Sequence, residues 1–177
     1  MHIITTDKKW EEVMPRSATA NLLKLLNTCR QHQDVDKILA VQQSCRFMFN
    51  GASRQNKGTA AALAGSHLGI EVYRIDVSAV VSKYIGETEK NIDKIFTAAA
   101  GKSWILFFDE ADALFGKRTD VKSGHEHYAN QEISYLLQRL ERYRPPVFIA
   151  VNNKDTIAPA VVRYFHQTIH FSDTGKP

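Results

Sequence analysis

Two adjacent carboxylates, Asp109 and Glu110, follow an unbroken run of apolar residues in the segment WILFFDEADA, residues 104–113. Such a run predicts a strand buried on both faces, as in the middle of a parallel sheet. Open α/β sheets bind ligands at the carboxyl ends of their strands, where one acid of such a pair can hold Mg²⁺ and the other can polarise water. The pair is therefore a candidate centre for nucleotide hydrolysis. In the alternative interpretation, Asp109 caps the following helix and Glu110 lies in its first turn.

A second candidate site begins at Gly51, directly after the short apolar run of residues 45–50, CRFMFN. The segment GASRQNKGTAAALAG then passes from a loop into an alanine-rich helix, and a strand, a loop and a helix in that order are the context of a phosphate-binding loop. Gly51 and Lys57 stand at the separation of the template G-x-x-x-x-G-K-[ST]. Lys57 could reach phosphate oxygens as a point charge.

The same loop departs from the template at two positions. Asn56 replaces the second glycine, at a position where backbone conformations cost most other residues about 1–2 kcal/mol and cost Asn less. Gly58 replaces the hydroxyl residue, and Thr59 comes one residue too late, roughly 100° further around the helix. Taken alone, the loop is a weak match to a phosphate cradle.

A longer pattern surrounds both sites. It comprises YRIDVSAVVSKYIGETEKN before the acid-bearing strand, LFFDEADALFGKR on it, and HYANQEISYLLQRLERY and VFIAVNN after it. These segments closely resemble the AAA+ ATPases, especially the protein-remodelling branch, over roughly residues 10–171. The resemblance implies a P-loop fold, subunits in a ring, nucleotide at subunit interfaces and ATP-driven pulling on a protein substrate.

The resemblance also implies roles for particular residues. Gly51, Asn56, Lys57, Gly58 and Thr59 match Walker A, which binds ATP; Asp109 matches the Mg²⁺-holding acid of Walker B; Glu110 and Asn152 match the residues that activate and position water; Lys83, Tyr84, Ile85 and Gly86 match the aromatic pore loop that grips substrate. Two alternatives stay open. Tyr84 and Ile85 could pack beneath their own loop, and Asn152 could be a turn residue, because Asn-Asn after a strand is a strong turn signal.

Two further departures concern the arginine finger and the lid. The family's remodelling members tend to read RRFD or RPGRFD where this chain reads VVRYFHQ, which puts Tyr164 at the finger position and Arg163 beside it. An arginine finger is worth about 10³ to 10⁵ in rate, and tyrosine cannot neutralise the same charge. The sequence also ends at Pro177, where the family continues into a helical lid, so we expect no lid in residues 1–177.

The remaining pattern predicts a single domain over residues 1–177, a three-layer α/β core with a five-stranded parallel sheet. Strands are expected near residues 45–50, 71–76, 104–109, 147–151 and 168–171, and the clearest helix at residues 129–142, where Ile133, Leu136, Leu137 and Leu140 form one apolar stripe. A chain of 177 residues can bury about 70% of its extended surface, enough for such a core.

Composition and residue patterning argue against several classes of protein. No apolar run approaches the roughly 20 residues of a membrane span, and the amino end lacks the apolar stretch of a signal peptide. Cys29 and Cys45 form neither a CxxC pair nor a disulfide framework, which favours reduced thiols and a cytoplasmic location. The net charge is +4, but the basic residues are dispersed among acids, which argues against nucleic acid as a partner.

Two functions from different classes follow. The first is an ATPase subunit that binds Mg-ATP through Lys57 and Asp109, hydrolyses it with Glu110 and Asn152, and moves a protein substrate with Tyr84. The second is a non-hydrolysing AAA+-like scaffold or regulatory subunit of a more complete AAA+ partner. The departures at Asn56, Gly58 and Tyr164 predict weak or absent ATP binding, slow hydrolysis at best, and a chain that is monomeric or weakly associated alone.

Overall fold

The structure is a computed structural model that describes residues 1–34, 45–116 and 125–172. Its strands are β1 His2–Ile4, β2 Arg46–Asn50, β3 Val72–Asp76, β4 Ile105–Asp109, β5 Val147–Val151 and β6 Gln167–His170. Its α-helices are α1 Arg16–Asp34, α2 Arg54–Leu68, α3 Glu87–Ala99, α4 Asp112–Phe115, α5 His125–Arg142 and α6 Pro159–Val162. Short 3₁₀ turns lie at Trp10–Glu12, Val77–Ala79 and Lys154–Thr156.

The strands form one sheet in the order β1-β3-β4-β5-β2-β6, in which β3, β4, β5, β2 and β6 run parallel. This confirms the predicted parallel α/β core with the acid-bearing strand inside it. Every residue of β4 and β5 is buried, as expected for apolar strands covered on both faces. The expected strand count was wrong by one, because β1 adds an antiparallel edge strand beside β3. Three residues are too few for an alternating pattern to identify that strand from sequence.

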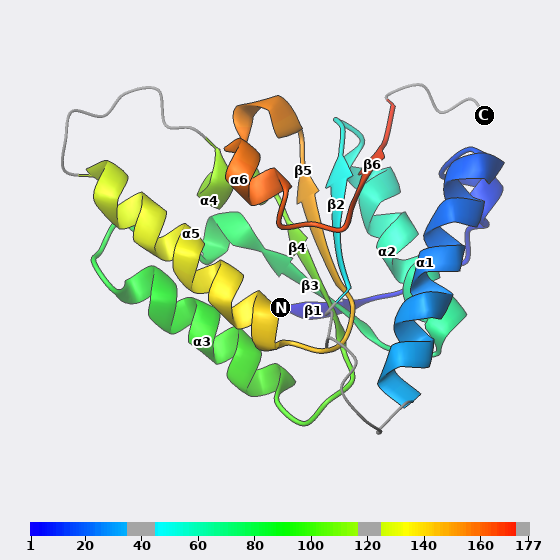
Figure 1. The fold of residues 1–177 in the computed structure, drawn as a ribbon, viewed down its shortest axis with the longest axis horizontal. Helices are drawn as coiled ribbons and strands as arrows, with labels where there is room; N and C mark the ends of the chain where they lie inside the picture. Colours follow the sequence, from blue (N-terminus) through cyan, green and yellow to red (C-terminus); the bar gives the residue numbers. More distant parts are fainter. Residues whose placement is uncertain (35–44, 117–124, 173–177) are drawn as a thin grey trace.

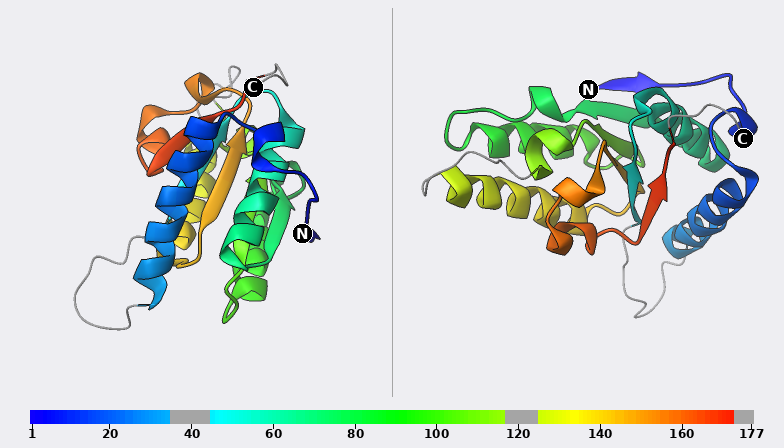
Figure 2. Two further views of the ribbon diagram at one scale, coloured as in Figure 1. Left: turned by 90° about the vertical axis from the view of Figure 1, so that its right-hand side faces the viewer. Right: turned by 90° about the horizontal axis from the view of Figure 1, so that it is seen from above.

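Helices cover both faces of the sheet (Figures 1 and 2). On one face, α1 and α2 pack over a core that includes Leu22, Leu26 and Phe49. On the other face, α3 and α5 pack over a core that includes Ile92 and Leu136. The arrangement is the predicted three-layer fold, and none of the described helices is long and apolar enough to cross a membrane.

A disulfide joins Cys29 of α1 to Cys45, the residue before β2, with the Cα atoms 6.1 Å apart. The expectation of two reduced thiols is therefore wrong for this structure. Sequence spacing gave no sign of the pairing, because the two cysteines meet only when α1 packs against the sheet. The bond fastens α1 to the beginning of the strand that leads to Gly51.

Candidate functional site

Four of the predicted site residues meet at the edge of the sheet where the parallel strands end. Gly51 follows β2, Asp109 ends β4, Asn152 follows β5, and Lys57 reaches this edge from α2. Three segments far apart in the sequence, which carry Gly51 with Lys57, Asp109, and Asn152, are thus brought together by the parallel order of the strands. The structure brings these four residues together, and their roles stay predictions that the side-chain contacts below bear on.

The loop after β2 is shorter than a phosphate cradle. Only Gly51, Ala52 and Ser53 separate β2 from α2, which begins at Arg54. Ser53 caps the helix, its hydroxyl accepting from the Asn56 N–H at 3.4 Å and its carbonyl from the Lys57 N–H at 3.2 Å. These backbone donors serve the first turn of a helix, whereas a phosphate-binding loop directs its backbone N–H groups at the anion.

The two positions that depart from the template, Asn56 and Gly58, both lie within α2, and their surroundings show whether the fold requires those departures. The Thr59 hydroxyl donates to the Gln55 carbonyl at 2.9 Å, so it serves the helix backbone. A Cβ at Gly58 would lie 3.8 Å from the Phe107 ring, an ordinary contact, so the missing hydroxyl residue is not excluded by space. Asn56 and Gly58 are differences in chemistry that the fold does not require.

The surroundings of position 51 require a glycine. The φ of Gly51 is +135°, a backbone conformation that residues other than glycine rarely adopt. A Cβ at this position would lie 1.9 Å from the Phe171 carbonyl oxygen. The Phe171 N–H donates to the Asn50 carbonyl at 2.7 Å, which brings the chain after β6 against this turn. A packing contact therefore accounts for this glycine without a ligand.

Lys57 is directed into the protein. Its side chain is buried, with 2% of the residue exposed, and Nζ donates to the Gly51 carbonyl at 2.6 Å, the Val151 carbonyl at 2.9 Å and Asn152 Oδ1 at 3.2 Å. All three donor positions of the ammonium group are used by these acceptors. Burial lowers the pKa of Lys57, with the nearby acids opposing that shift. The lysine ties the turn after β2 to the end of β5.

Both acids, Asp109 and Glu110, form ion pairs with arginine side chains. Arg54 Nε donates to Asp109 Oδ2 at 2.9 Å, and Arg54 Nη1 lies 2.6 Å from Glu110 Oε1. Arg74 of β3 contacts the same Asp109 oxygen, and Arg54 also lies 3.9 Å from Asp76. The hydrogen bond to Asp109 raises the pKa of Arg54, so this guanidinium stays charged. Charge-assisted bonds of this type are about twice as strong as neutral ones.

Glu110 has a strained backbone. It is the one residue other than glycine with a positive φ, 56°, among the described residues, and its N–H donates to Asp109 Oδ1 at 3.0 Å. Such conformations cost about 1–3 kcal/mol and gather at functional sites. Asp109 does not cap the following helix, because no side chain makes the cap bond at the start of α4. The alternative in which Asp109 is a plain helix cap is therefore wrong.

Asn152 lies between the lysine and a third acid. Its Oδ1 faces Lys57, and its N–H donates to both carboxylate oxygens of Asp112, at 2.9 and 3.1 Å. The Asn-Asn turn interpretation accounts for its neighbour, since the Asn153 side chain caps the following 3₁₀ turn by accepting from Asp155 N–H at 2.9 Å. Asn152 itself is a polar residue of the site, although its role in positioning water stays a prediction.

Sequence reasoning missed Arg54, Arg74 and Asp112. Arg54 was visible as a cation at a variable position of the template, but its partner depends on the start of α2. Arg74 was visible as a charged residue inside an apolar strand, next to β4. A charge at a position that packing should reserve for apolar groups is the signal that could have found it.

Mg²⁺ does not fit this arrangement of side chains. A Mg²⁺ ion takes carboxylate, hydroxyl and water oxygens in near-octahedral geometry, usually with substrate phosphates. Here two guanidinium groups occupy the same Asp109 oxygen, the Arg54 guanidinium also pairs with Glu110, and Gly58 offers no hydroxyl. Arg54 thus supplies the positive charge that a metal ion would otherwise supply.

In the segment Lys83–Gly86, which lies outside this cluster, the first three residues are exposed and Gly86 is half-buried. Tyr84 is 65% exposed and Ile85 78% exposed, so the alternative in which they pack beneath their own loop is wrong. The base of the segment is fixed, because the Ser82 N–H donates to the buried Thr88 hydroxyl at 3.0 Å and the Ser82 hydroxyl contacts Glu87. Two large apolar side chains on an anchored loop are available to a protein partner.

The Tyr164 side chain makes its contacts within its own chain. Its hydroxyl donates to the Leu137 carbonyl of α5 at 2.5 Å, its ring packs against the α3–α5 core, and the Arg46 guanidinium lies 4.1 Å from the ring centre. Burial raises the pKa of Tyr164, so it remains a neutral structural residue. Arg163 is exposed.

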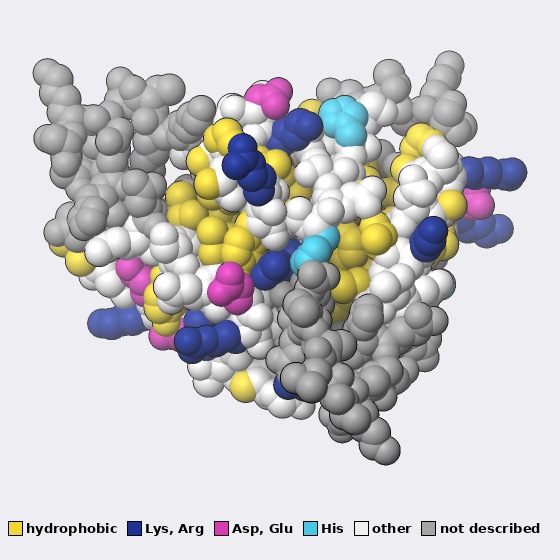
Figure 3. All heavy atoms as spheres, in the orientation of Figure 1, with side chains coloured by type: hydrophobic (Ala, Val, Ile, Leu, Met, Phe, Trp, Pro, Cys, Tyr) yellow, Lys and Arg dark blue, Asp and Glu magenta, His cyan; other side chains and the backbone are white. Residues whose placement is uncertain are grey.

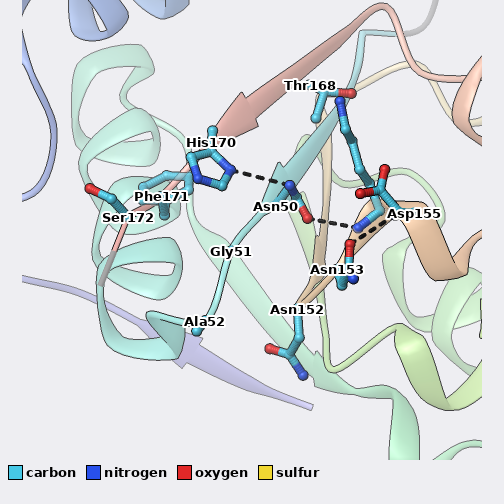
Figure 4. Close-up of a pocket in the computed structure, with 11 residues that line it drawn as sticks. Asn50, Gly51, Ala52, Asn152, Asn153, Asp155, Thr168, His170, Phe171 and Ser172 are labelled. Atoms are coloured by element: carbon cyan, nitrogen blue, oxygen red, sulfur yellow. Dashed lines mark hydrogen bonds between the residues drawn. The ribbon is translucent and has the colours of Figure 1, made fainter. Parts of the chain in front are cut away.

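A polar cavity of about 650 Å³ adjoins the cluster beyond Gly51 and Asn152. Figure 4 shows its lining from the ends of β2, β5 and β6, where the Asn50 amide donates to His170 Nδ1 at 3.2 Å and Asn50 Oδ1 accepts from the Lys154 N–H at 2.8 Å. These bonds hold the three strand ends together. The amides that line the cavity are therefore partly committed to the fold.

The parallel order β6-β2-β5-β4-β3, with a lysine, an acid pair and an asparagine at its carboxyl edge, defines a P-loop NTPase core of the three-layer type. A model of the family described as "ATPase family associated with various cellular activities (AAA)" matches residues 47–173. The chain belongs to this AAA family, whose members generally use ATP with Mg²⁺.

Several curated relatives are similar to most of this chain. An uncharacterized AAA family ATPase of Sinorhizobium fredii is 30% identical over 158 residues, 87% of this chain and 47% of that protein. A proteasome-activating nucleotidase of Thermococcus gammatolerans is 26% identical over 149 residues, 81% of this chain and 38% of that protein. Cell division protein C of Sulfolobus acidocaldarius is 31% identical over 119 residues, 62% of this chain and 32% of that protein. The chain thus spans less than half the length of these relatives.

Proposed function

We propose that this chain is an AAA module that acts through protein contacts, as a scaffold or regulatory subunit of a more complete AAA partner, with weak or absent ATP binding. The observation that carries the proposal is the Arg54 guanidinium, which pairs with both Asp109 and Glu110. An arginine on the two acids neutralises the charge that would hold Mg²⁺ and occupies the carboxylate that would polarise water.

The contacts of Lys57 support the same proposal. A lysine that serves phosphates must present its ammonium group to the ligand, whereas Lys57 donates to three acceptors of its own chain. Binding a phosphate there would require breaking these buried bonds, each worth about 1.5–3 kcal/mol when one partner is charged. Relatives named as proteasome-activating nucleotidases make other AAA subunits and protein substrates the partners to test first.

A competing function, ATP hydrolysis by this chain, is favoured by the convergence of Lys57, Asn152 and the acid pair at one edge of the sheet. It requires Arg54 to leave the acids, and the Arg54 side chain is 47% exposed and has room to do so. The exposed Tyr84 loop serves either function, as the contact with a substrate or with a partner.

Calorimetric titration of the purified chain with Mg-ATP, alongside an assay of phosphate release, tests the proposal. We expect no saturable heat up to about 1 mM ATP, the upper end of usual KM values, and no phosphate release above background. Micromolar binding with brisk hydrolysis would instead establish the competing function.

A cytoplasmic location stays a prediction.

A further inference from the structure

A second cavity, of about 430 Å³, opens at the opposite edge of the sheet, where β4 and β5 begin. It lies between the connection from α3 to β4 and the connection from α5 to β5, at the lower edge of the molecule in Figure 1. We call it the basic cavity and define it by Phe96, Ala100, Lys102, Arg139, Arg142 and Tyr143. None of these residues belongs to the candidate functional site.

The floor of the basic cavity is aromatic. The rings of Phe96 and Tyr143 meet edge to face, with centroids 5.6 Å apart and planes at 74°. The Tyr143 hydroxyl donates to the Trp104 carbonyl at 2.6 Å, and burial raises the pKa of Tyr143, so the phenol stays neutral. The floor thus offers an apolar surface whose one polar atom already has a partner.

The charged residues that line the cavity are all basic: Lys102, Arg139, Arg142 and Arg144. Basic residues in the last turn of a helix complement its dipole, which accounts for Arg139 and Arg142 in α5. The dipole of α5 does not account for Lys102, which lies on the turn before β4 with Nζ 4.0 Å from the centre of the Trp104 ring. Cations from α5 and from the connection between α3 and β4 therefore converge on one apolar recess.

Aromatic faces hold two of these cations beside the recess. The Arg139 guanidinium lies 5.3 Å from the centre of the Phe96 ring and its Nε lies 3.5 Å from Asp93, while Lys102 lies over Trp104. Contacts of this kind orient a long side chain and reduce the entropy that it loses when it binds an anion. The cavity is therefore partly organised for an anionic ligand with an apolar anchor.

We propose that the basic cavity is a docking site for an acidic linear segment of a partner protein. One aromatic side chain of that segment contacts the Phe96–Tyr143 floor, and its flanking carboxylates pair with Lys102 and Arg142. Charge complementarity selects this occupant, and the aromatic anchor in a recess provides most of the affinity, as in other interfaces. The proposal goes beyond the proposed function and depends on neither ATP nor Mg²⁺.

The shape of the site favours a peptide over a nucleic acid. Single-stranded nucleic acids need an extended basic groove with aromatic faces on which successive bases stack. The aromatic pair here is buried at the bottom of one recess. On the face shown in Figure 3, Lys and Arg side chains are scattered and form no stripe.

Fluorescence anisotropy of the whole chain with a short fluorescein-labelled peptide, one phenylalanine among aspartates and glutamates, tests the proposal. We expect saturable binding that weakens at least about tenfold when the peptide's phenylalanine becomes alanine or when the protein carries Arg142→Glu. Ala100→Trp, at an exposed lining position, should block the recess without altering its charge and produce a similar loss. Lys24→Glu, an exposed cation of α1 on the other helical layer, is the matched control and should leave binding within about twofold.

Three outcomes would overturn the proposal: no saturable binding, an equal loss with Lys24→Glu, or tighter binding of a single-stranded oligonucleotide than of the peptide. Circular dichroism of each variant shows whether it is folded. If Arg142→Glu does not fold, Ala100→Trp still tests the proposal. Because no nucleotide is present in this assay, its failure leaves the calorimetric result on ATP unaffected.

Discussion

At the scale of single residues, Arg54 distinguishes this chain most sharply from the template that its sequence resembles. It stands at a variable position of the Walker A match, yet its guanidinium reaches both acids of the Walker B pair. Lys57, Asp109 and Glu110 keep their residue types, and their contacts are internal. In this structure the side chains expected to act on a nucleotide hold the strand ends and α2 together.

Removing this pairing together with the two template departures should restore ligand binding. We expect the triple variant Arg54→Ala, Asn56→Gly, Gly58→Thr to bind Mg-ATP at least about tenfold more tightly than the unmodified chain, because it frees the acids, loosens the loop and adds a hydroxyl. Calorimetry measures the gain, and Lys24→Ala on α1 serves as the control for surface charge. An unchanged affinity in a folded triple variant would show that Arg54 is not what excludes the ligand.

Tyr84 provides a second test at this scale. Because the side chain is 65% exposed, Tyr84→Ala should change the free energy of unfolding by less than about 0.5 kcal/mol, as surface substitutions usually do. The same substitution should abolish any remodelling activity of an assembly that contains the chain. Chemical denaturation measures the first effect. A loss of about 3 kcal/mol or more, typical of a truncated buried aromatic, would contradict the pore-loop assignment.

At the scale of elements, the start of α2 sets the geometry of the site, and α1 is fastened to the strand that leads to it. Ser53 begins α2 early, which carries Arg54 toward β4 and turns Lys57 inward. The Cys29–Cys45 disulfide fixes α1 beside the start of β2, the strand that ends at the Gly51 turn. Helix α2 thus contributes two side chains to the site, whereas α1 is joined to it only through β2.

The disulfide makes a quantitative prediction. The cysteines are 16 residues apart, and closing a loop of about 15 residues stabilises a folded chain by about 3 kcal/mol in the chain-entropy estimate. Cys45→Ser, or reduction with a thiol, should therefore lower the free energy of unfolding by roughly that amount. Denaturation with and without reductant measures it. Identical unfolding curves would show that the thiols are not joined in the purified protein.

His166 links the beginnings of β2 and β6, and we expect this contact to make stability depend on pH. Its Nδ1 accepts from the Arg46 N–H at 3.2 Å, and desolvation together with the charge of Arg46 lowers the pKa of His166 below its ordinary value. The unfolded chain therefore binds this proton more readily, and stability should fall as the pH drops below about 6.5. His166→Gln, which keeps an acceptor, should flatten the dependence of the melting temperature on pH between about 7 and 5. An unchanged slope would exclude His166 as the titrating group.

At the scale of the whole molecule, the candidate functional site and the basic cavity lie at opposite edges of the sheet. The carboxyl edge of the sheet carries the paired acids and lysine, and the opposite edge carries the basic cavity. The exposed Tyr84 loop, at the beginning of α3, provides a third surface. This division suits a subunit that makes several protein contacts.

The same features predict the oligomeric state. Tyr164 is held against α5 and offers no cation to a neighbouring subunit, so nucleotide should not drive assembly of this chain. Light scattering should give a mass near the 20.0 kDa of the monomer at micromolar concentration, unchanged by Mg-ATP. A stable ring that forms only when Mg-ATP is added would contradict this prediction and the proposed function together.

The sequence by itself determined the fold class and the residues that meet at the site. Buried strands such as β4 and β5 leave apolar runs that can be read without coordinates, and the parallel order of such strands brings Lys57, Asp109, Glu110 and Asn152 to one edge. These are local patterns, and one general rule of sheet architecture converts them into a site.

Only the tertiary structure decided what those residues contact. The pairing of Arg54 with the acids, the inward turn of Lys57, the contact of Gly51 with Phe171 and the Cys29–Cys45 bond each join segments separated along the chain. The edge strand β1 was likewise fixed by its partner β3 and not by its own three residues. Hydrogen bonds and ion pairs act over a few ångströms, so their partners are settled by where packing places each backbone segment, and sequence spacing does not record that placement.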